Sequence, residues 1–82
     1  MVTLLYFGRL SDVTGGLSET LDIPKEISTL ESLRHWVDER HGGTGALTHH
    51  TVRIAVDGDI TPDQATLQSA NEIAFMPPVG GG

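Results

Sequence analysis

The feature that most constrains the fold is a single amphipathic segment in a chain whose other apolar runs have strand character. Leu30, Leu33 and Val37 recur at the i, i+3 and i+7 spacing of one helix face, with Trp36 beside them. It is the clearest helical segment in the chain. The sequence therefore predicts one main helix, and the remaining ordered structure must come from strands on either side of it.

Both ends of this helix carry recognisable signals. Ser28 is followed three residues later by Glu31, which predicts a capping box at the helix start. Gly42-Gly43 predicts the end, because glycine readily adopts the left-handed conformation that terminates helices. The polar side of the helix is expected to be exposed and to carry two i, i+4 pairs, Arg34 with Asp38 and His35 with Glu39.

Short strands are expected before and after the helix. Residues 2–7 are predicted to form a central strand covered on both faces, and residues 17–23 alternate like a strand with one face in water. The break at Gly15-Gly16 between them predicts a turn and a first hairpin. A turn at Asp57-Gly58 predicts a second hairpin that starts from residues 52–56, and residues 72–76 form the last strand. This order, ββαββ with a final strand, predicts an α+β domain in which one main helix covers one face of a mixed sheet.

Size and composition narrow the possible functions. A chain of 82 residues has room for one sheet and one helix but for no enclosed catalytic cavity of its own, so chemistry is expected to be shared with a partner. The absence of cysteine removes disulfides, thiolate metal sites and thiol nucleophiles, and makes the cytoplasm the default location. With 11 acidic residues against 5 Lys and Arg, we expect no binding to nucleic acid. No apolar run is long enough for a signal region or a membrane span, so no membrane partner is expected.

The histidines and glycines give no strong site. His35 and His41 do not share one helix face, and His49 and His50 are adjacent in a loop, so all four are predicted to be surface residues. Residues 42–45 follow a helix and contain no lysine, which favours a helix stop over a phosphate-binding loop.

Three carboxylates surround the predicted turn after residue 56. Asp57, Asp59 and Asp63 could form a weak cation site, but the stretch has no closing glutamate of the kind that an EF-hand loop uses. Solvated turn acids are the favoured interpretation. No serine, threonine or lysine lies in a recognisable nucleophile context.

The C-terminal residues admit two interpretations of about equal weight. Three final glycines are costly to order, which favours a frayed end. Against this, the rigid Pro77-Pro78 directs the chain away from the last strand, and Val79 to Gly82 could span about 13–14 Å, enough to enter a narrow channel in another protein. A terminal carboxylate is a poor electrophile, and the chain has no nucleotide site, so its activation would have to occur in trans.

A family resemblance changes this balance. The strand at residues 72–76, the ββαββ order and the ending Phe-Met-Pro-Pro-Val-Gly-Gly-Gly at residues 75–82 closely resemble the small, sulfur-carrying subunit of molybdopterin synthase. That subunit is a β-grasp (ubiquitin-like) protein of the MoaD/ThiS group. Residues 5–10 are similar to the first strand and the following turn of this family. The resemblance extends over the whole chain, although only the last ten or so residues are specific.

The resemblance implies a function for each part of the chain. It implies a β-grasp domain at residues 1–78 and a flexible glycine tail at residues 79–82, whose terminal glycine an E1-like adenylyltransferase activates with ATP. A sulfur-donor system then converts it to a thiocarboxylate. The tail enters the large synthase subunit and gives its sulfur to precursor Z, forming the dithiolene of molybdopterin, in a synthase of two large and two small subunits. The chain itself would bind no cofactor and supply no catalytic side chain.

The same resemblance assigns roles by position. Gly82 would carry the sulfur, and Gly80 and Gly81 would thread the channel. Phe75 is expected either in the docking surface or in the core, and the sequence leaves the two open. The remaining partner-binding residues would be Arg9, Met76, Pro77, Pro78 and Val79.

The chain departs from the family pattern at three places, and two alternative functions stay open. An aromatic residue is usual where Met76 stands, an asparagine where Asp57 stands, and Gly-Asp where Ala70-Asn71 stands. The first alternative is a ubiquitin-like modifier that forms isopeptides through Gly82. The second is a sulfur carrier of another pathway, such as thiamine synthesis, whose members lack the Pro-Pro-Val approach to the tail.

Overall fold

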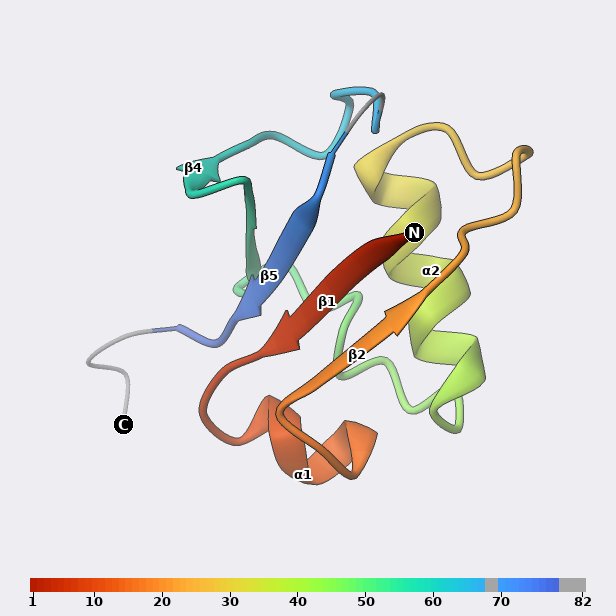
Figure 1. Ribbon diagram of the computed structural model, residues 1–82. Helices are drawn as coiled ribbons and strands as arrows, with labels where there is room; N and C mark the ends of the chain where they lie inside the picture. Colours follow the sequence, from red (N-terminus) through yellow and green to blue (C-terminus); the bar gives the residue numbers. More distant parts are fainter. Residues whose placement is uncertain (68–69, 79–82) are drawn as a thin grey trace.

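A computed structural model describes residues 1–67 and 70–78 and places five strands in one mixed sheet (Figure 1). The predicted α+β arrangement is confirmed: strand order is β2-β1-β5-β3-β4, with β1 parallel to β5 and every other pair antiparallel. The predicted tail at residues 79–82 lies outside the described residues. The elements are β1 (Val2–Tyr6), α1 (Leu10–Thr14), β2 (Ser18–Leu21), α2 (Leu30–Arg40), β3 (Arg53–Val56), β4 (Asp59–Ile60) and β5 (Glu72–Met76).

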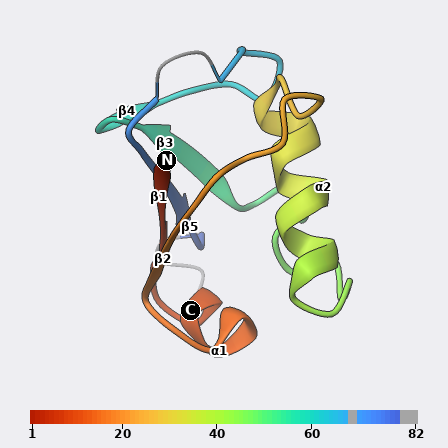
Figure 2. The same cartoon turned by 45° about the vertical axis from the view of Figure 1, so that its right-hand side comes forward.

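The core lies between the sheet and α2, which crosses one face of the sheet (Figure 2). Alternate residues of each strand point to that face, so that Leu4 pairs with Ile73, and Tyr6 with Phe75, beneath the helix. The helix contributes its predicted apolar face, and all three of its core residues are fully buried. The fully buried core consists mainly of Leu4, Tyr6, Leu30, Leu33, Val37, Leu47, Ile54, Ile73 and Phe75.

The prediction that β1 is covered on both faces is wrong. Burial alternates along this strand, since Val2, Leu4 and Tyr6 are buried whereas Thr3 and Leu5 are only half-buried. Among the described residues, no helix lies over the second face (Figure 2), and β1 is interior because β2 and β5 lie on its two edges. A run of apolar residues therefore indicated an interior strand correctly, but not a second covering layer.

A short helix replaces the simple turn expected between the first two strands. Residues 2–5 pair antiparallel with residues 18–21, as expected, but α1 lies between them. Leu10 is its buried residue, and it ends at Gly15, whose φ of 79° is left-handed. With five residues, α1 is too short for helical periodicity to stand out in the sequence.

The main helix is capped one residue later than predicted. Thr29 is the N-cap, and its hydroxyl accepts a hydrogen bond from the backbone N–H of Ser32 at 3.2 Å. The Ser32 hydroxyl in turn accepts from the Thr29 N–H at 3.1 Å, so a capping box forms with serine in the place of glutamate. Thr29 is extended because it bridges to Thr66, whereas the Ser28 carbonyl accepts from Leu67. The predicted pair of Ser28 with Glu31 is therefore wrong.

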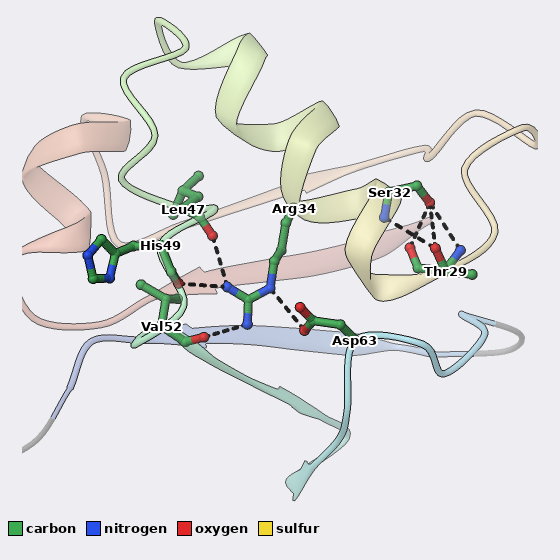
Figure 3. A network of polar contacts seen from close by, with 7 residues as sticks. All are labelled: Thr29, Ser32, Arg34, Leu47, His49, Val52 and Asp63. Atoms are coloured by element: carbon green, nitrogen blue, oxygen red, sulfur yellow. Dashed lines mark hydrogen bonds and ion pairs between the residues drawn. The ribbon is translucent and has the colours of Figure 1, made fainter.

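Arg34 is buried, although the sequence places it on the exposed side of the helix. Its Nη1 donates to the carbonyl oxygens of Leu47 at 3.1 Å and His49 at 3.2 Å, and its Nη2 donates to that of Val52 (Figure 3). Its Nε donates to Asp63 Oδ1 at 3.0 Å. One guanidinium thus satisfies three backbone carbonyls of the segment that leads into β3 and one carboxylate beyond it.

Asp38 is the matching acceptor on the next turn of the helix. It is also buried, and its two carboxylate oxygens accept from the backbone N–H groups of Gly45 and Leu47, both at 3.1 Å. The predicted exposed pair of Arg34 with Asp38 is therefore wrong. Each side chain satisfies the backbone of the loop at residues 42–51, because this loop has no regular structure to pair its own polar groups.

Replacing Arg34 by methionine should lower the free energy of unfolding by about 3 kcal/mol. Each buried carbonyl that loses its donor costs about 1–3 kcal/mol, and water that reaches these carbonyls offsets part of the loss. Denaturant unfolding followed by circular dichroism measures this loss. The matched control is Lys25→Met, an exposed residue whose replacement should change stability by less than about 0.5 kcal/mol. Equal stabilities of the two variants would contradict the role of Arg34.

Candidate functional site

The chain leaves the sheet at Pro77-Pro78, directly after β5. The backbone N–H of Phe7 donates to the Phe75 carbonyl at 3.1 Å, so the pairing with β5 continues one residue past the end of β1. Gly8 then adopts a φ of +56°, and a Cβ built there would lie only 2.9 Å from Pro77 Cγ. The close approach of Pro77 to the β1–α1 connection therefore suits glycine, and it fixes the direction of the chain at the base of the tail.

Of the two alternatives for Phe75, the structure shows the core one. Phe75 is fully buried, and its ring stacks on that of Tyr6 with centroids 5.7 Å apart. It cannot contact a partner without leaving the core. Arg9 and Pro78 are exposed, and Met76 and Pro77 are half-buried, so these four remain accessible. Val79, Gly80, Gly81 and Gly82 lie outside the described residues.

An apolar row that the sequence analysis missed crosses the uncovered face of the sheet. Strand register aligns Leu5 of β1 with Ala74 of β5, Ala74 with Ala55 of β3, and Ala55 with Ile60 of β4. Ile60 is 60% exposed at the edge, and Phe7, directly after β1, is 46% exposed. The sequence signal for this row is that the strand residues that alternate with those facing α2 are also apolar.

Two hollows lie beside the base of the tail. The larger, about 540 Å³, is bounded by the β1–α1 connection, α1 and the loop before β3, and it includes Arg9, His49, Pro77 and Pro78. The smaller, about 330 Å³, is lined by His50, Thr51, Arg53, Pro77 and Pro78. Strand register explains the second hollow, because Arg53 pairs directly with Met76, the residue before the two prolines.

A polar cluster ties β1 and β2 to the end of α2. Glu19 Oε2 accepts from the Tyr6 hydroxyl at 2.6 Å and lies 2.8 Å from His41 Nε2, while Arg40 donates to Glu19 Oε1 at 3.1 Å. His41 is therefore partly buried and bonded, which corrects its assignment as a surface residue. Because Tyr6 also stacks on Phe75, the cluster holds the part of the sheet from which the tail emerges.

The cluster shifts the pKa values of both acids in it. Burial opposes ionisation of Glu19, but the hydrogen bonds from Tyr6, His41 and Arg40 outweigh it and lower the pKa of Glu19 from 4.5 to about 2. Burial, together with the bond to the Glu19 carboxylate, raises the pKa of Tyr6 far above its usual value, so its hydroxyl stays a donor. Ionised Glu19 therefore stabilises the fold.

Two of the three carboxylates near the predicted turn, those of Asp57 and Asp63, are occupied by backbone and arginine donors. Asp57 has a φ of 49°, and its Oδ1 accepts from the N–H groups of Asn71 at 3.1 Å and Glu72 at 2.9 Å, at the start of β5. Asp63 pairs with Arg34. Within residues 1–67 and 70–78, no group of three or more histidine or acidic side chains is placed to hold a metal ion. Over the same residues, no helix has the length and hydrophobicity needed to cross a membrane.

Glu19→Gln should flatten the acid dependence of stability. The depressed pKa means that ionised Glu19 contributes fully above about pH 4.5, and that this contribution is lost as the pH falls from 4.5 to about 2. The variant should be less stable than the natural chain at pH 7, by on the order of 2 kcal/mol, and the gap should close across this window. Urea unfolding at successive pH values measures it.

The control for this experiment is Glu26→Gln, which removes an exposed carboxylate outside the cluster. Its stability should follow that of the natural chain at every pH. If the free energy of unfolding of Glu19→Gln changed with pH in the same way as that of the natural chain, the stabilising role of the cluster would be contradicted.

Comparisons of the sequence with known proteins agree on one family. The sequence model of the ThiS family matches residues 4–82. The molybdopterin synthase sulfur carrier subunit of Homo sapiens is 34% identical over 84 residues, which cover 99% of this chain and 93% of the human protein. The subunit of the same name from Haemophilus influenzae is 25% identical over 83 residues, which cover both chains completely.

Solved structures agree on the fold. SAMP1 from Haloferax volcanii superposes with a TM-score of 0.77 at 17% identity, over 99% of this chain and 98% of that one. A protein of Pyrococcus furiosus, designated molybdopterin converting factor, subunit 1, gives a TM-score of 0.76 at 22% identity, over 95% and 97% of the two chains. These likenesses confirm the predicted β-grasp fold.

Proposed function

The chain belongs to the ThiS family, and from this premise we propose that it is the small, sulfur-carrying subunit of a molybdopterin synthase. The observation that carries the proposal is its 34% identity, along nearly its whole length, to a human protein with that name. The position of Pro77-Pro78 supports it, because the chain leaves the sheet there and Pro78 and nearby Arg9 are exposed. On this proposal the domain presents the tail, and the large subunit supplies the catalytic groups.

The chemistry takes place at the C-terminal carboxylate of Gly82. An E1-like adenylyltransferase joins this carboxylate to the AMP of ATP and releases pyrophosphate, which converts a poor electrophile into an activated acyl group. The donor system supplies sulfur at the oxidation level of sulfide, which attacks the acyl carbon and displaces AMP, leaving a thiocarboxylate. In the large subunit the sulfur passes to precursor Z, and water supplies the oxygen that restores the carboxylate. The lack of cysteine fits this scheme, since a sulfur atom on the backbone end needs no thiol side chain.

The apolar row on the open sheet face is proposed as the docking surface for the large subunit. It runs from Leu5 through Ala74 and Ala55 to Ile60, and no helix covers it. Phe7 and Met76 extend it toward the base of the tail, so a partner that covers the row also reaches the start of residues 79–82. Phe75 acts beneath this surface, where it supports β5 from the core.

Intact mass measurement of the chain, isolated from its native host, tests the chemistry. The expected result is a species heavier by the exchange of one oxygen for sulfur, which is lost when Gly81 and Gly82 are deleted. Discrete conjugates to lysine side chains, without the sulfur species, would instead identify the chain as a protein modifier. A chain without these two glycines that still sustained molybdoenzyme activity would refute the assignment of the tail.

Ile60→Asp should weaken binding to the large subunit about tenfold, because it places a charge in the apolar row, and it should leave the domain folded. The control is Leu17→Asp, which introduces the same charge at a residue that is 72% exposed and lies outside the row. Phe75→Asp should unfold the domain, since that side chain is fully buried. Calorimetric titration with circular dichroism of each variant provides the measurement, and normal affinity of Ile60→Asp would refute the docking surface.

A further inference from the structure

Four nitrogen-bearing side chains surround the point where the tail leaves the domain. Arg9 and His49 line the larger hollow beside Pro77-Pro78, and His50 and Arg53 line the smaller one. We call these four residues the basic collar. All of them are exposed. Because β3, the loop before it and the β1–α1 connection each contribute, the collar exists only in the folded chain.

The collar contrasts with the charge of the rest of the chain. The formal charge is −6, with only five lysine and arginine residues. Arg34 is buried in its network and Arg40 is bonded to Glu19, which leaves Lys25 as the one remaining cationic side chain outside the collar. Among residues 1–67 and 70–78, the guanidinium groups of Arg9 and Arg53 form no ion pair. Positive charge available for binding is therefore concentrated at the base of the tail.

Two acids that lie near collar residues, Asp63 and Asp12, form no ion pair with them. Asp63 lines a third hollow together with His50 and Arg53, but its carboxylate is bonded to Arg34 Nε at 3.0 Å. Asp12 lies in the first turn of α1, and its backbone N–H bonds to the carbonyl of Arg9, with no ion pair between the two side chains. The collar is thus available to an outside anion.

The structure also holds the histidine part of the collar in place. The carbonyl of His49 accepts from buried Arg34, and the ring Nδ1 of His49 accepts from the backbone N–H of Thr51 at 3.3 Å. This leaves Nε2 as the ring atom that can donate outward. The imidazole rings of His49 and His50 stack with centroids 4.6 Å apart. The collar therefore presents outward donors on an ordered segment, which suits carboxylate acceptors.

We propose that the basic collar binds an acidic rim, formed by aspartate and glutamate side chains, around the channel of the large subunit that receives the tail. This inference rests on the proposed function. Residues 79–82 can span at most about 13–14 Å, so the collar lies one tail length from Gly82 when the tail is extended. It therefore contacts the mouth of the channel and not the reacting group. The acidic rim repels the acidic remainder of the chain and attracts the collar. The chain therefore approaches with its collar forward, which orients the tail for entry.

Association kinetics with the large subunit of the same organism test this proposal. The rate for the natural chain should fall about tenfold as NaCl rises from about 50 mM to about 500 mM, because salt screens the attraction. Arg53→Glu and Arg9→Glu should each slow association at low salt by at least about threefold. The matched control, Lys25→Glu, makes the same change in net charge away from the collar and should have a smaller effect. Circular dichroism confirms that each variant is folded.

A rate that is unchanged or higher in strong salt, or an equal effect of Lys25→Glu and Arg53→Glu, would overturn the collar. The intact mass measurement reports separately on the sulfur-carrier function. If that function fails, NMR titration of the full chain with poly-glutamate still tests the collar. Chemical shift changes centred on the four collar residues would support it, and their absence at low salt would refute it.

Discussion

The parallel pairing of β1 and β5 is the constraint on which the rest of the structure depends. It places the first and last strands of the chain side by side in the interior of the sheet, with Leu4 beside Ile73 and Tyr6 beside Phe75. Parallel neighbours need a long connection, and here nearly the whole chain supplies it, including the helix that covers the core. Both strands run toward the same end of the sheet (Figure 1), so Pro77, directly after β5, lies beside Gly8 in the connection that follows β1.

The second constraint is the irregular loop between α2 and β3. Apart from the bond from the Val52 N–H to the His49 carbonyl, side chains pair much of its backbone: buried Arg34 supplies donors and buried Asp38 supplies acceptors. Burying two charged groups is tolerable because each is bonded to several partners. The same loop places His49 and His50 beside Pro77 and Pro78, where the proposed collar lies.

Local sequence patterns predicted the elements that can be recognised without knowing which residues they pack against. The strand at residues 72–76 was found because an apolar run ends at two prolines, and α2 because its core residues repeat with helical spacing. The burial of Arg34 and Asp38 could not be predicted, because their partners lie in a distant loop and the i, i+4 rule describes an isolated helix. The row from Leu5 to Ile60 was missed for a similar reason, since it exists only once strand register is known.

The candidate site separates reactivity from recognition. The family resemblance predicts roles for Gly82 and the prolines, whereas Arg53 joins the candidate site only through its register with Met76. A terminal glycine has no side chain with which to distinguish one channel from another, so any specificity must come from the surface around the base of the tail. Two prolines and the contact of Pro77 with Gly8 make that base rigid, and a rigid base allows charges on the domain to determine where a short tail points. On the proposed function, recognition at the base and chemistry at the end are physically separate tasks, so a chain of only 82 residues can take part in both.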